Sequence, residues 1–295
     1  MSAQILDGNA VAAKIRSELA EEIVELKKEG CSPRLEVILV GDNPASKSYV
    51  SMKQKDCTEI GILGQTTHLP ASTTEDVLLT LVDRSNKDDN VHGILVQLPL
   101  PQHISEAHVI ARISPDKDVD GFHPINTGKM VAGSECFLPC TPAGMQELLK
   151  EYNINPKGKH VVVVGRSNIV GKPFAIMMMQ KKEWANATVT VCHTGSGDLK
   201  PFTRQADILV AAAGRPAMIT ADMIKPGAVV IDVGVNRIDD PQAKRGYRLV
   251  GDVDFAAAKE VASAITPVPG GVGPMTRAIL LKNTVQSAKK FHTLL

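Results

Sequence analysis

Three polar side chains that could build a substrate site recur at helical spacing in the stretch SKSYVSMKQK (46–55). Ser46, Tyr49 and Lys53 lie at i, i+3 and i+7, so on a helix they share one face. A lysine amine can transfer protons near neutral pH when desolvation or a nearby cation lowers its pKa. The alternative for Lys53 is a solvated surface charge, which is the usual state of a lysine on a helix.

A glutamine interrupts the next apolar run, HGILVQLPL (92–100). Gln97 lies near the carboxyl end of this predicted buried strand, where open α/β sheets place their ligand crevices. A buried amide needs a hydrogen-bond partner. A lysine on a neighbouring helix would supply one, and Lys53 is the candidate.

Two carboxylates precede a glycine in PDKDVDG (115–121). Asp118 and Asp120 flank a valine, and one such carboxylate can accept two N–H donors from a heterocycle in a charge-assisted pairing. The alternative is that both are turn residues ahead of Gly121. We expect no metal site, because no Cys or His pattern has the spacing of ligands, and the cysteine pair at 136 and 140 lacks a second pair.

The segment VVVVGRSNIVGKP (161–173) predicts a strand that ends at Gly165 and a helix that begins near Pro173. Gly165 and Gly171 have no side chain, so a pyrophosphate could approach the backbone at the positive end of the helix. The spacing G-x-S-x-x-x-G differs from the dinucleotide fingerprint G-x-G-x-x-G. A tight strand-to-helix turn without a ligand therefore remains the alternative.

The end of the following strand favours NADP over NAD. NAD sites usually carry an acidic residue there to hold the ribose hydroxyls, whereas this strand ends in His193 and Thr194 with no carboxylate before Asp198. Together with Arg166, these residues would offer donors to a 2′-phosphate. The alternative is that Arg166 pairs with a surface carboxylate.

Close to the carboxyl end of the chain, the stretch ITPVPGGVGPMT (265–276) concentrates three prolines and three glycines. Such a loop is rigid, and its backbone can lie close to a flat ligand. The alternative is a turn that leads into the last helix.

Strand-like and helix-like segments alternate along the chain, which predicts an α/β protein with two three-layer domains and a cleft between them. The second domain is expected to be a Rossmann-like doubly wound parallel sheet, with strands near 160–165, 187–193, 207–214, 228–234 and 248–253. Because chain ends often lie close together, we place the last helix with the first domain. The expected domains are 1–140 plus 270–295, and 141–269.

The composition argues against several classes of function. The 295 residues carry a net charge of +1, which provides no bulk attraction to nucleic acid or anionic membranes, and aromatic residues make up only 3%. No apolar run reaches the roughly 18 residues of a spanning helix, and the first residues do not resemble a secretory signal. Five cysteines are too few for a disulfide framework. We expect a cytoplasmic enzyme.

Six motifs in this order resemble the bifunctional methylenetetrahydrofolate dehydrogenase/methenyltetrahydrofolate cyclohydrolase family. They are SKSYVSMKQK, VQLPLP, PDKDVDGFHPIN, FLPCTP, GRSNIVGKP and ITPVPGGVGPMT, and they run from residue 46 to residue 276. The resemblance implies a bifunctional enzyme of one-carbon metabolism. It would oxidise methylenetetrahydrofolate with NADP and hydrolyse the methenyl product to formyltetrahydrofolate. We expect no fused formate–tetrahydrofolate ligase domain.

The resemblance also implies residue roles. Lys53 is the catalytic amine, Gln97 bonds it, Tyr49 packs along the folate, and Asp120 holds the pterin. The further folate contacts are Ser46, Val96, Leu98, Pro269, Gly270 and Gly273. The NADP contacts are Gly165, Arg166, Ser167, Gly171, Thr194 and Val235. Family members often carry serine in place of Thr194, and the hydroxyl is kept. The resemblance further implies a homodimer formed through the cofactor half.

Two alternatives stay open beside the bifunctional enzyme. One is a relative that has kept a single activity or prefers NAD; the presence of Lys53 and Gln97 argues against the first, and Arg166 against the second. The other is a non-catalytic module that binds a dinucleotide. Such a module would have no use for a lysine aligned with a glutamine and an aspartate.

Overall fold

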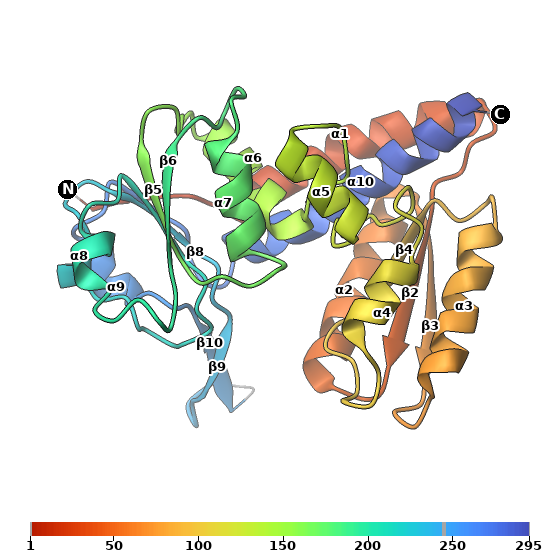
Figure 1. Ribbon diagram of the computed structural model, residues 1–295, viewed down its shortest axis with the longest axis horizontal. Helices are drawn as coiled ribbons and strands as arrows, with labels where there is room; N and C mark the ends of the chain where they lie inside the picture. The colour runs from red at the N-terminus through yellow and green to blue at the C-terminus, as the bar shows by residue number, and fades with distance from the viewer. Residues whose placement is uncertain (1, 244–245, 295) are drawn as a thin grey trace. The chain divides into compact units, whose positions relative to one another are not determined.

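The computed structural model describes residues 2–243 and 246–294 (Figure 1). The chain divides into two compact units: Met1–Ala12 with Thr141–Thr276, and Ala13–Cys140 with Arg277–Leu295. We call them the six-stranded unit and the three-stranded unit after their main sheets.

The three-stranded unit is built on a parallel sheet in the order β3-β2-β4. Its strands are β2 (Arg34–Val40), β3 (Leu63–Leu69) and β4 (Gly93–Val96). The register pairs Leu35 with both Gly64 and Gly93. Strands β2 and β4 are buried along nearly their whole length, as expected for strands of a parallel sheet covered by helices.

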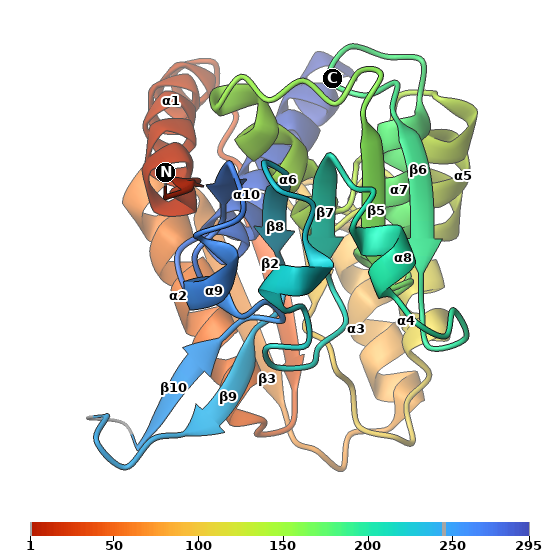
Figure 2. The same ribbon diagram turned by 90° about the vertical axis from the view of Figure 1, so that its left-hand side faces the viewer.

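Helices follow each of these strands, and two long helices complete the unit (Figures 1 and 2). The shorter ones are α2 (Pro44–Ile60), α3 (Glu75–Lys87), α4 (Glu106–Arg112) and α5 (Pro124–Ala132). The long helices α1 (Gly8–Lys28) and α10 (Val272–Leu294) contain the unit boundaries within them. One core cluster packs Ile38, Leu78 and Val82 with Ile94 and Val109.

The six-stranded unit has a wholly parallel sheet in the order β1-β11-β8-β7-β5-β6. Its strands are β1 (Gln4–Ile5), β5 (His160–Val164), β6 (Thr188–Cys192), β7 (Ile208–Ala211), β8 (Val229–Asp232) and β11 (Ala264–Ile265). The expectation of a Rossmann-like doubly wound sheet is confirmed. Its helices are α6 (Cys140–Glu151), α7 (Gly171–Met179), α8 (Lys200–Thr203) and α9 (Phe255–Ala258), with a 3₁₀ turn at Ala221–Met223.

One predicted strand lies outside this sheet. The segment near 248–253 forms β10 (Tyr247–Val250), which pairs antiparallel with β9 (Asn236–Asp239) in a separate two-stranded ribbon. Just after β10, the backbone N–H groups of Asp252 and Val253 donate to the Asp232 carboxylate at the end of β8 instead of to a strand of the sheet.

The division of the chain differs from the expected one at both ends. Strand β1 extends the six-stranded sheet beside β11, and the backbone N–H of Asn9 donates to the carbonyl of Gly270 at 3.1 Å. A side chain at Gly8 would overlap the carbonyl oxygen of Gly271. These contacts place the first residues and residues 270–276 in the six-stranded unit rather than with residues 13–140.

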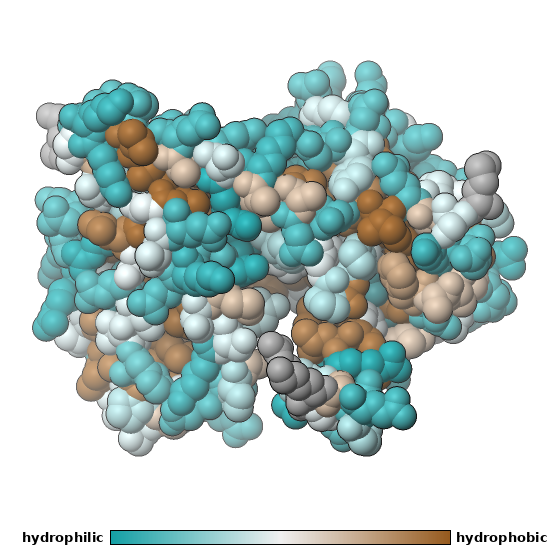
Figure 3. Space-filling model, turned by 180° about the vertical axis from the view of Figure 1, so that it is seen from behind, coloured by the Kyte–Doolittle hydropathy of each residue, from teal (hydrophilic) through white to brown (hydrophobic). Residues whose placement is uncertain are grey.

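Hydrophobic side chains on the face shown in Figure 3 form separate patches surrounded by hydrophilic ones. Scattered exposed apolar residues are normal for a folded domain. Among the described residues, no helix combines the length and apolar character needed to cross a bilayer.

Candidate active site

A buried lysine and a glutamine form the centre of the candidate site in the three-stranded unit. Lys53 on α2 is only 8% exposed, and its Nζ donates to Oε1 of Gln97 at 3.1 Å. The structure therefore places Lys53 in the interior, and the alternative of a solvated surface charge does not hold. Burial of an ammonium is costly unless it is paired or hydrogen-bonded. The contact with Gln97 therefore restricts where the amine of Lys53 can lie.

Gln97 is held so that its carbonyl oxygen faces the lysine. It follows β4 directly, and its backbone N–H donates to Ile38 of β2 at 2.8 Å. Its side-chain Nε2 donates to the carbonyl of Leu98 at 2.7 Å, which leaves Oε1 as the acceptor for Lys53. The sheet and the chain after it therefore orient the amide.

Asp120 supplies the carboxyl group of the site. Burial raises the pKa of its carboxyl group, and the nearby positive charge of Lys53 acts in the opposite direction. The backbone next to it is held by Cys140, whose Sγ donates to the carbonyl of Val119 at 3.2 Å and whose N–H donates to the carbonyl of Asp120 at 3.3 Å. Lys53, Gln97 and Asp120 together offer a base, an orienting amide and an acceptor for N–H donors.

The two aspartates of the predicted turn have different roles. Asp118 is buried, and its carboxylate accepts the backbone N–H groups of Phe122 and His123 and the Nδ2 of Asn126. These bonds stabilise the turn, so Asp118 is a turn residue, as the alternative interpretation of the sequence predicted. Asp120 instead lies near enough to Lys53 for the positive charge of the lysine to counteract the rise that burial causes in the pKa of its carboxyl group.

The remaining predicted folate residues of this unit lie on the same elements. Ser46 is buried and Tyr49 half-buried on α2, with Val96 and Leu98 on either side of Gln97. The helix begins where the Asn43 side chain accepts the N–H groups of Ala45 and Ser46. This cap fixes the first turn of the helix.

A buried ion pair that the sequence did not reveal anchors α2 one turn beyond Lys53. Asp56 Oδ2 lies 2.5 Å from Nη1 of Arg277 on α10, and both side chains are largely buried. Burial raises the pKa of Asp56, while the charges of Arg277 and Arg16 lower it. The only signal in the sequence is an acidic residue three positions after Lys53.

A second unforeseen cation anchors the Asp120 loop. Lys117 is 2% exposed, and its Nζ donates to the carbonyls of Ser85, Asn86 and Asp88 at 3.1, 2.9 and 2.8 Å. These carbonyls lie at the end of α3, where the helix dipole favours a positive charge. The carbonyl of Lys117 accepts the N–H of Ile94 at 2.8 Å, which joins the loop to β4.

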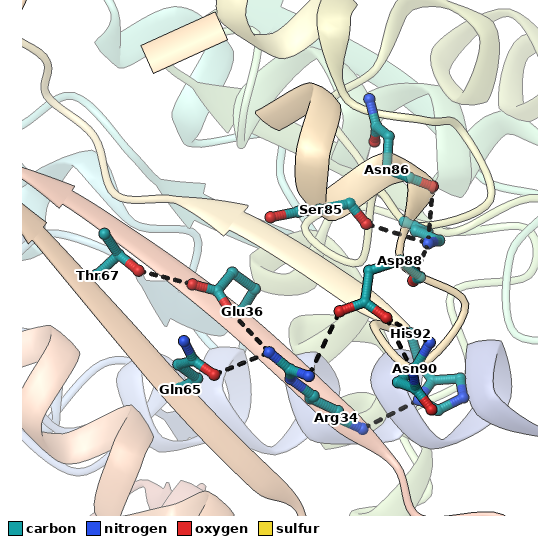
Figure 4. A network of polar contacts seen from close by, with 10 residues as sticks. Arg34, Glu36, Gln65, Thr67, Ser85, Asn86, Asp88, Asn90 and His92 are labelled. Carbon is teal, nitrogen blue, oxygen red and sulfur yellow. Dashed lines mark hydrogen bonds and ion pairs between the residues drawn. The ribbon is translucent and has the colours of Figure 1, made fainter. Parts of the chain in front are cut away.

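An arginine network fixes the strand ends beside this anchor (Figure 4). Arg34 donates to Gln65 at 2.8 Å and lies 3.5 Å from Asp88. The buried Glu36 lies 3.7 Å from Arg34 and accepts from Thr67 at 2.8 Å. The network joins β2 to β3 and to the turn after α3.

The six-stranded unit brings the predicted dinucleotide residues to one end of its sheet. The register pairs Val164 of β5 with Cys192 of β6, so Arg166 and Thr194 both follow two residues after paired strand ends. Both side chains are exposed. In the described part of the chain no carboxylate forms an ion pair with Arg166, and Asp198 accepts the N–H of Lys200.

The glycines of this turn have a structural explanation. A Cβ on Gly165 would overlap the carbonyl oxygen of Ala212, and one on Gly171 would overlap that of Gly165. Helix α7 begins at Gly171, two residues before the predicted start. A dinucleotide phosphate fits this end of the sheet because the exposed Arg166, Ser167 and Thr194 supply hydrogen-bond donors.

The last two predicted segments also lie in the six-stranded unit. Val235 is half exposed after β8. The N–H of Gly271 donates to the carbonyl of Pro267 at 2.9 Å and shapes the loop that contains Pro269 and Gly270. Gly273 lies in the first turn of α10, where its Cβ position is open.

Comparison with known proteins decides the family. The model of the tetrahydrofolate dehydrogenase/cyclohydrolase catalytic domain matches residues 6–120, and that of the NAD(P)-binding domain matches residues 139–292. The chain belongs to the tetrahydrofolate dehydrogenase/cyclohydrolase family. This confirms the resemblance seen in the motifs, the expected enzyme class and the expected nicotinamide dinucleotide cofactor.

The family's curated members and solved structures match over the whole chain. The bifunctional protein FolD of Prosthecochloris aestuarii is 57% identical and that of Moorella thermoacetica 56%, each covering 98% of this chain and 99% and 100% of the relative. The FolD structure from Campylobacter jejuni aligns with a TM-score of 0.93 at 51% identity, covering 98% and 99% of the two chains. That from Trypanosoma brucei, complexed with NADP cofactor and inhibitor, aligns with a TM-score of 0.92 at 41% identity, covering 98% of each chain.

Replacing Arg277 by Met tests the anchor of α2. The substitution leaves the Asp56 carboxylate buried without its partner, so we expect the free energy of unfolding to fall by about 3 kcal/mol. Lys290→Met is the matched control, because Lys290 lies on the same helix and pairs with Asp116 in the open, where loss of a pair costs below about 1 kcal/mol. Urea unfolding measures both, and equal effects would contradict the buried-pair interpretation.

Proposed function

We propose that the chain oxidises methylenetetrahydrofolate with NADP⁺ to methenyltetrahydrofolate and hydrolyses this product to formyltetrahydrofolate. The observation that carries the proposal is the hydrogen bond from the buried Lys53 to Gln97 near Asp120, in the unit that contains most of the catalytic-domain match. A spectrophotometric assay with methylenetetrahydrofolate and either NADP⁺ or NAD⁺ tests it. The assay follows the reduced nicotinamide and the methenyl species together.

The dehydrogenase step demands alignment from the protein rather than an acid or a base. Bound NADP⁺ supplies the hydride acceptor. Arg166, Ser167 and Thr194 would hold its phosphorylated ribose, and the α7 N-terminus its pyrophosphate. The half-buried Tyr49 would lie along the folate and Asp120 would accept the N–H donors of the pterin, so that the one-carbon bridge is fixed in place.

The cyclohydrolase step requires proton transfer, and Lys53 is the group suited to it. The cationic methenyl centre repels a protonated amine, so substrate binding favours the neutral form that accepts a proton from the attacking water. Gln97 holds the amine in line through the 3.1 Å hydrogen bond. Asp120 would accept the N–H donors of the pterin and anchor it beside the lysine.

We further propose that the protein is cytoplasmic and forms a homodimer through the six-stranded unit. None of the five cysteines, all of which lie in the described ranges, forms a disulfide, which is typical of a reducing compartment. Strand β6 is the outermost strand of its sheet and therefore has one edge available for contacts. Gel filtration with light scattering measures the oligomeric state.

Replacing Lys53 by Met tests the assignment of the base. We expect the cyclohydrolase rate to fall about 100-fold or more, with the affinity for NADPH unchanged, because the nucleotide site lies on other elements. Lys55→Met is the matched control, since Lys55 is an exposed lysine on the same helix. Unchanged ring opening in Lys53→Met would refute the role of the amine.

Asp120→Asn tests the pterin contact. Loss of a charge-assisted hydrogen bond weakens binding by about 10- to 100-fold, so we expect KM for the folate substrate to rise by this factor while KM for NADP⁺ stays within about twofold. Asp116→Asn in the same loop serves as the control. Equal losses for both ligands would count against the assignment.

Arg166→Gln tests the recognition of the 2′-phosphate. We expect KM for NADP⁺ to rise about 10-fold or more, because a charged contact with phosphate is removed. NAD⁺ lacks this phosphate and is the internal control, so its KM should not change. A parallel rise for both cofactors would place Arg166 at the shared pyrophosphate instead.

A further inference from the structure

Two buried carboxylates lie at the end of the six-stranded sheet and are not used in the proposed mechanism. Asp232 is the last residue of β8, and Asp252 follows β10 after one residue. Their exposed fractions are 2% and 0%. In the part of the chain that the structure describes, neither forms an ion pair with a cation, so backbone N–H groups must account for their burial.

Asp252 accepts hydrogen bonds from three consecutive residues after β7. Its Oδ2 accepts the N–H groups of Ala213 at 2.6 Å and Gly214 at 2.8 Å, and its Oδ1 accepts that of Arg215 at 2.9 Å. Successive N–H groups in such a turn form a concave binding site for anions. Here the chain fills this site with its own carboxylate.

The same carboxylate also reaches the chain that follows β8. Asp252 Oδ1 accepts Nδ2 of Asn236 at 2.8 Å, and Asn236 comes directly after Val235. A side chain at Gly234 would overlap the Asp252 carboxylate, so this glycine lets the two segments approach. Asp252 thus joins the segments that leave two neighbouring strands.

Asp232 binds the backbone around Asp252. Its Oδ1 accepts the N–H groups of Gly234 and Asp252, and its Oδ2 accepts that of Val253, each at 2.9 Å. Burial raises the pKa of Asp232 to about 6, and the neighbouring Asp252 charge adds to this. The backbone position of Asp252 is therefore determined by a second carboxylate.

The joined segments border the point where this sheet binds ligands. The chain runs from β5 to β6 on one side and then returns to β7 on the other side of β5, and open α/β sheets place ligands at such a switch point. A Cβ on Gly165 would overlap the carbonyl oxygen of Ala212. The segment that Asp252 holds therefore lies against the turn that contains Arg166.

We propose that Asp252 is a positioning residue for the dinucleotide site. Its carboxylate fixes the segments that follow β7 and β8. It also accepts the N–H groups after β7, so these groups do not compete for the phosphates, which then bind at the turn after β5. The inference rests on the proposed function, because it assumes that NADP binds at this end of the sheet.

Asp252→Asn in the full-length protein tests the proposal. The amide keeps the shape but presents N–H donors to backbone N–H groups, so the bonded segments must shift. We expect the Kd of NADPH, measured by calorimetry, to rise about 10-fold or more. The cyclohydrolase rate, measured without any nucleotide, should stay within about twofold of wild type, because Lys53, Gln97 and Asp120 lie in the three-stranded unit.

Two further variants separate positioning from general loss of structure. Asn236→Ala removes a single hydrogen bond to Asp252, and we expect a smaller rise in the Kd of NADPH, about threefold, with normal cyclohydrolase activity. Asp254→Asn is the control, because Asp254 lies two residues away and caps α9 through Ala257. Its Kd for NADPH should equal that of wild type.

The outcomes distinguish the inference from the proposed function. Unchanged NADPH binding in Asp252→Asn would overturn the inference. A second combination of results would also overturn it: Asp252→Asn loses cyclohydrolase activity and NADPH binding to the same extent, and Asn236→Ala binds NADPH as wild type does. Failure of the wild-type protein to bind NADPH would contradict the proposed function itself.

Discussion

The candidate chemistry depends on one buried ammonium and the acceptor it finds. Lys53 is almost fully removed from solvent, and its Nζ donates a hydrogen bond to Oε1 of Gln97. This requirement extends outward, because Gln97 can present its oxygen only while its amide nitrogen is bound by the carbonyl of Leu98. The end of β4 and the helix that carries the lysine must therefore keep a fixed distance.

Charged anchors in the protein interior hold these elements at that distance. The ion pair between Asp56 and Arg277 fixes α2 against α10, and Lys117 fixes the Asp120 loop to the end of α3. Buried charges stabilise a single geometry more than they stabilise the fold, because their desolvation consumes most of the gain from pairing. Precision of this kind serves a site whose groups must stay within tenths of an ångström.

The six-stranded unit uses anions for the same purpose. Asp232 and Asp252 take up backbone N–H groups where the chain leaves the sheet, whereas the turn after β5 presents exposed donors. In this unit, the backbone N–H groups after β7 and β8 are hydrogen-bonded within the protein, whereas the donors of the turn after β5 remain for a ligand. The amino-acid composition does not predict which N–H groups are bonded internally, because the acidic residues that accept them follow different strands.

The sequence by itself determined most of the strands and helices and the parallel sheets, and it proposed the residues of both candidate sites, because buried strands, glycine turns and polar interruptions are local patterns. The motifs were also specific enough to indicate the family. Only the tertiary structure decided that the first residues pair with β11, that the segment after residue 246 forms a separate ribbon, and that Asp118 shapes a turn while Asp120 lies near Lys53. These outcomes depend on contacts between residues far apart in the chain, such as Asp56 with Arg277. The spacing of residues along the chain does not predict such contacts, because neither partner stands out in the sequence before folding buries the two together.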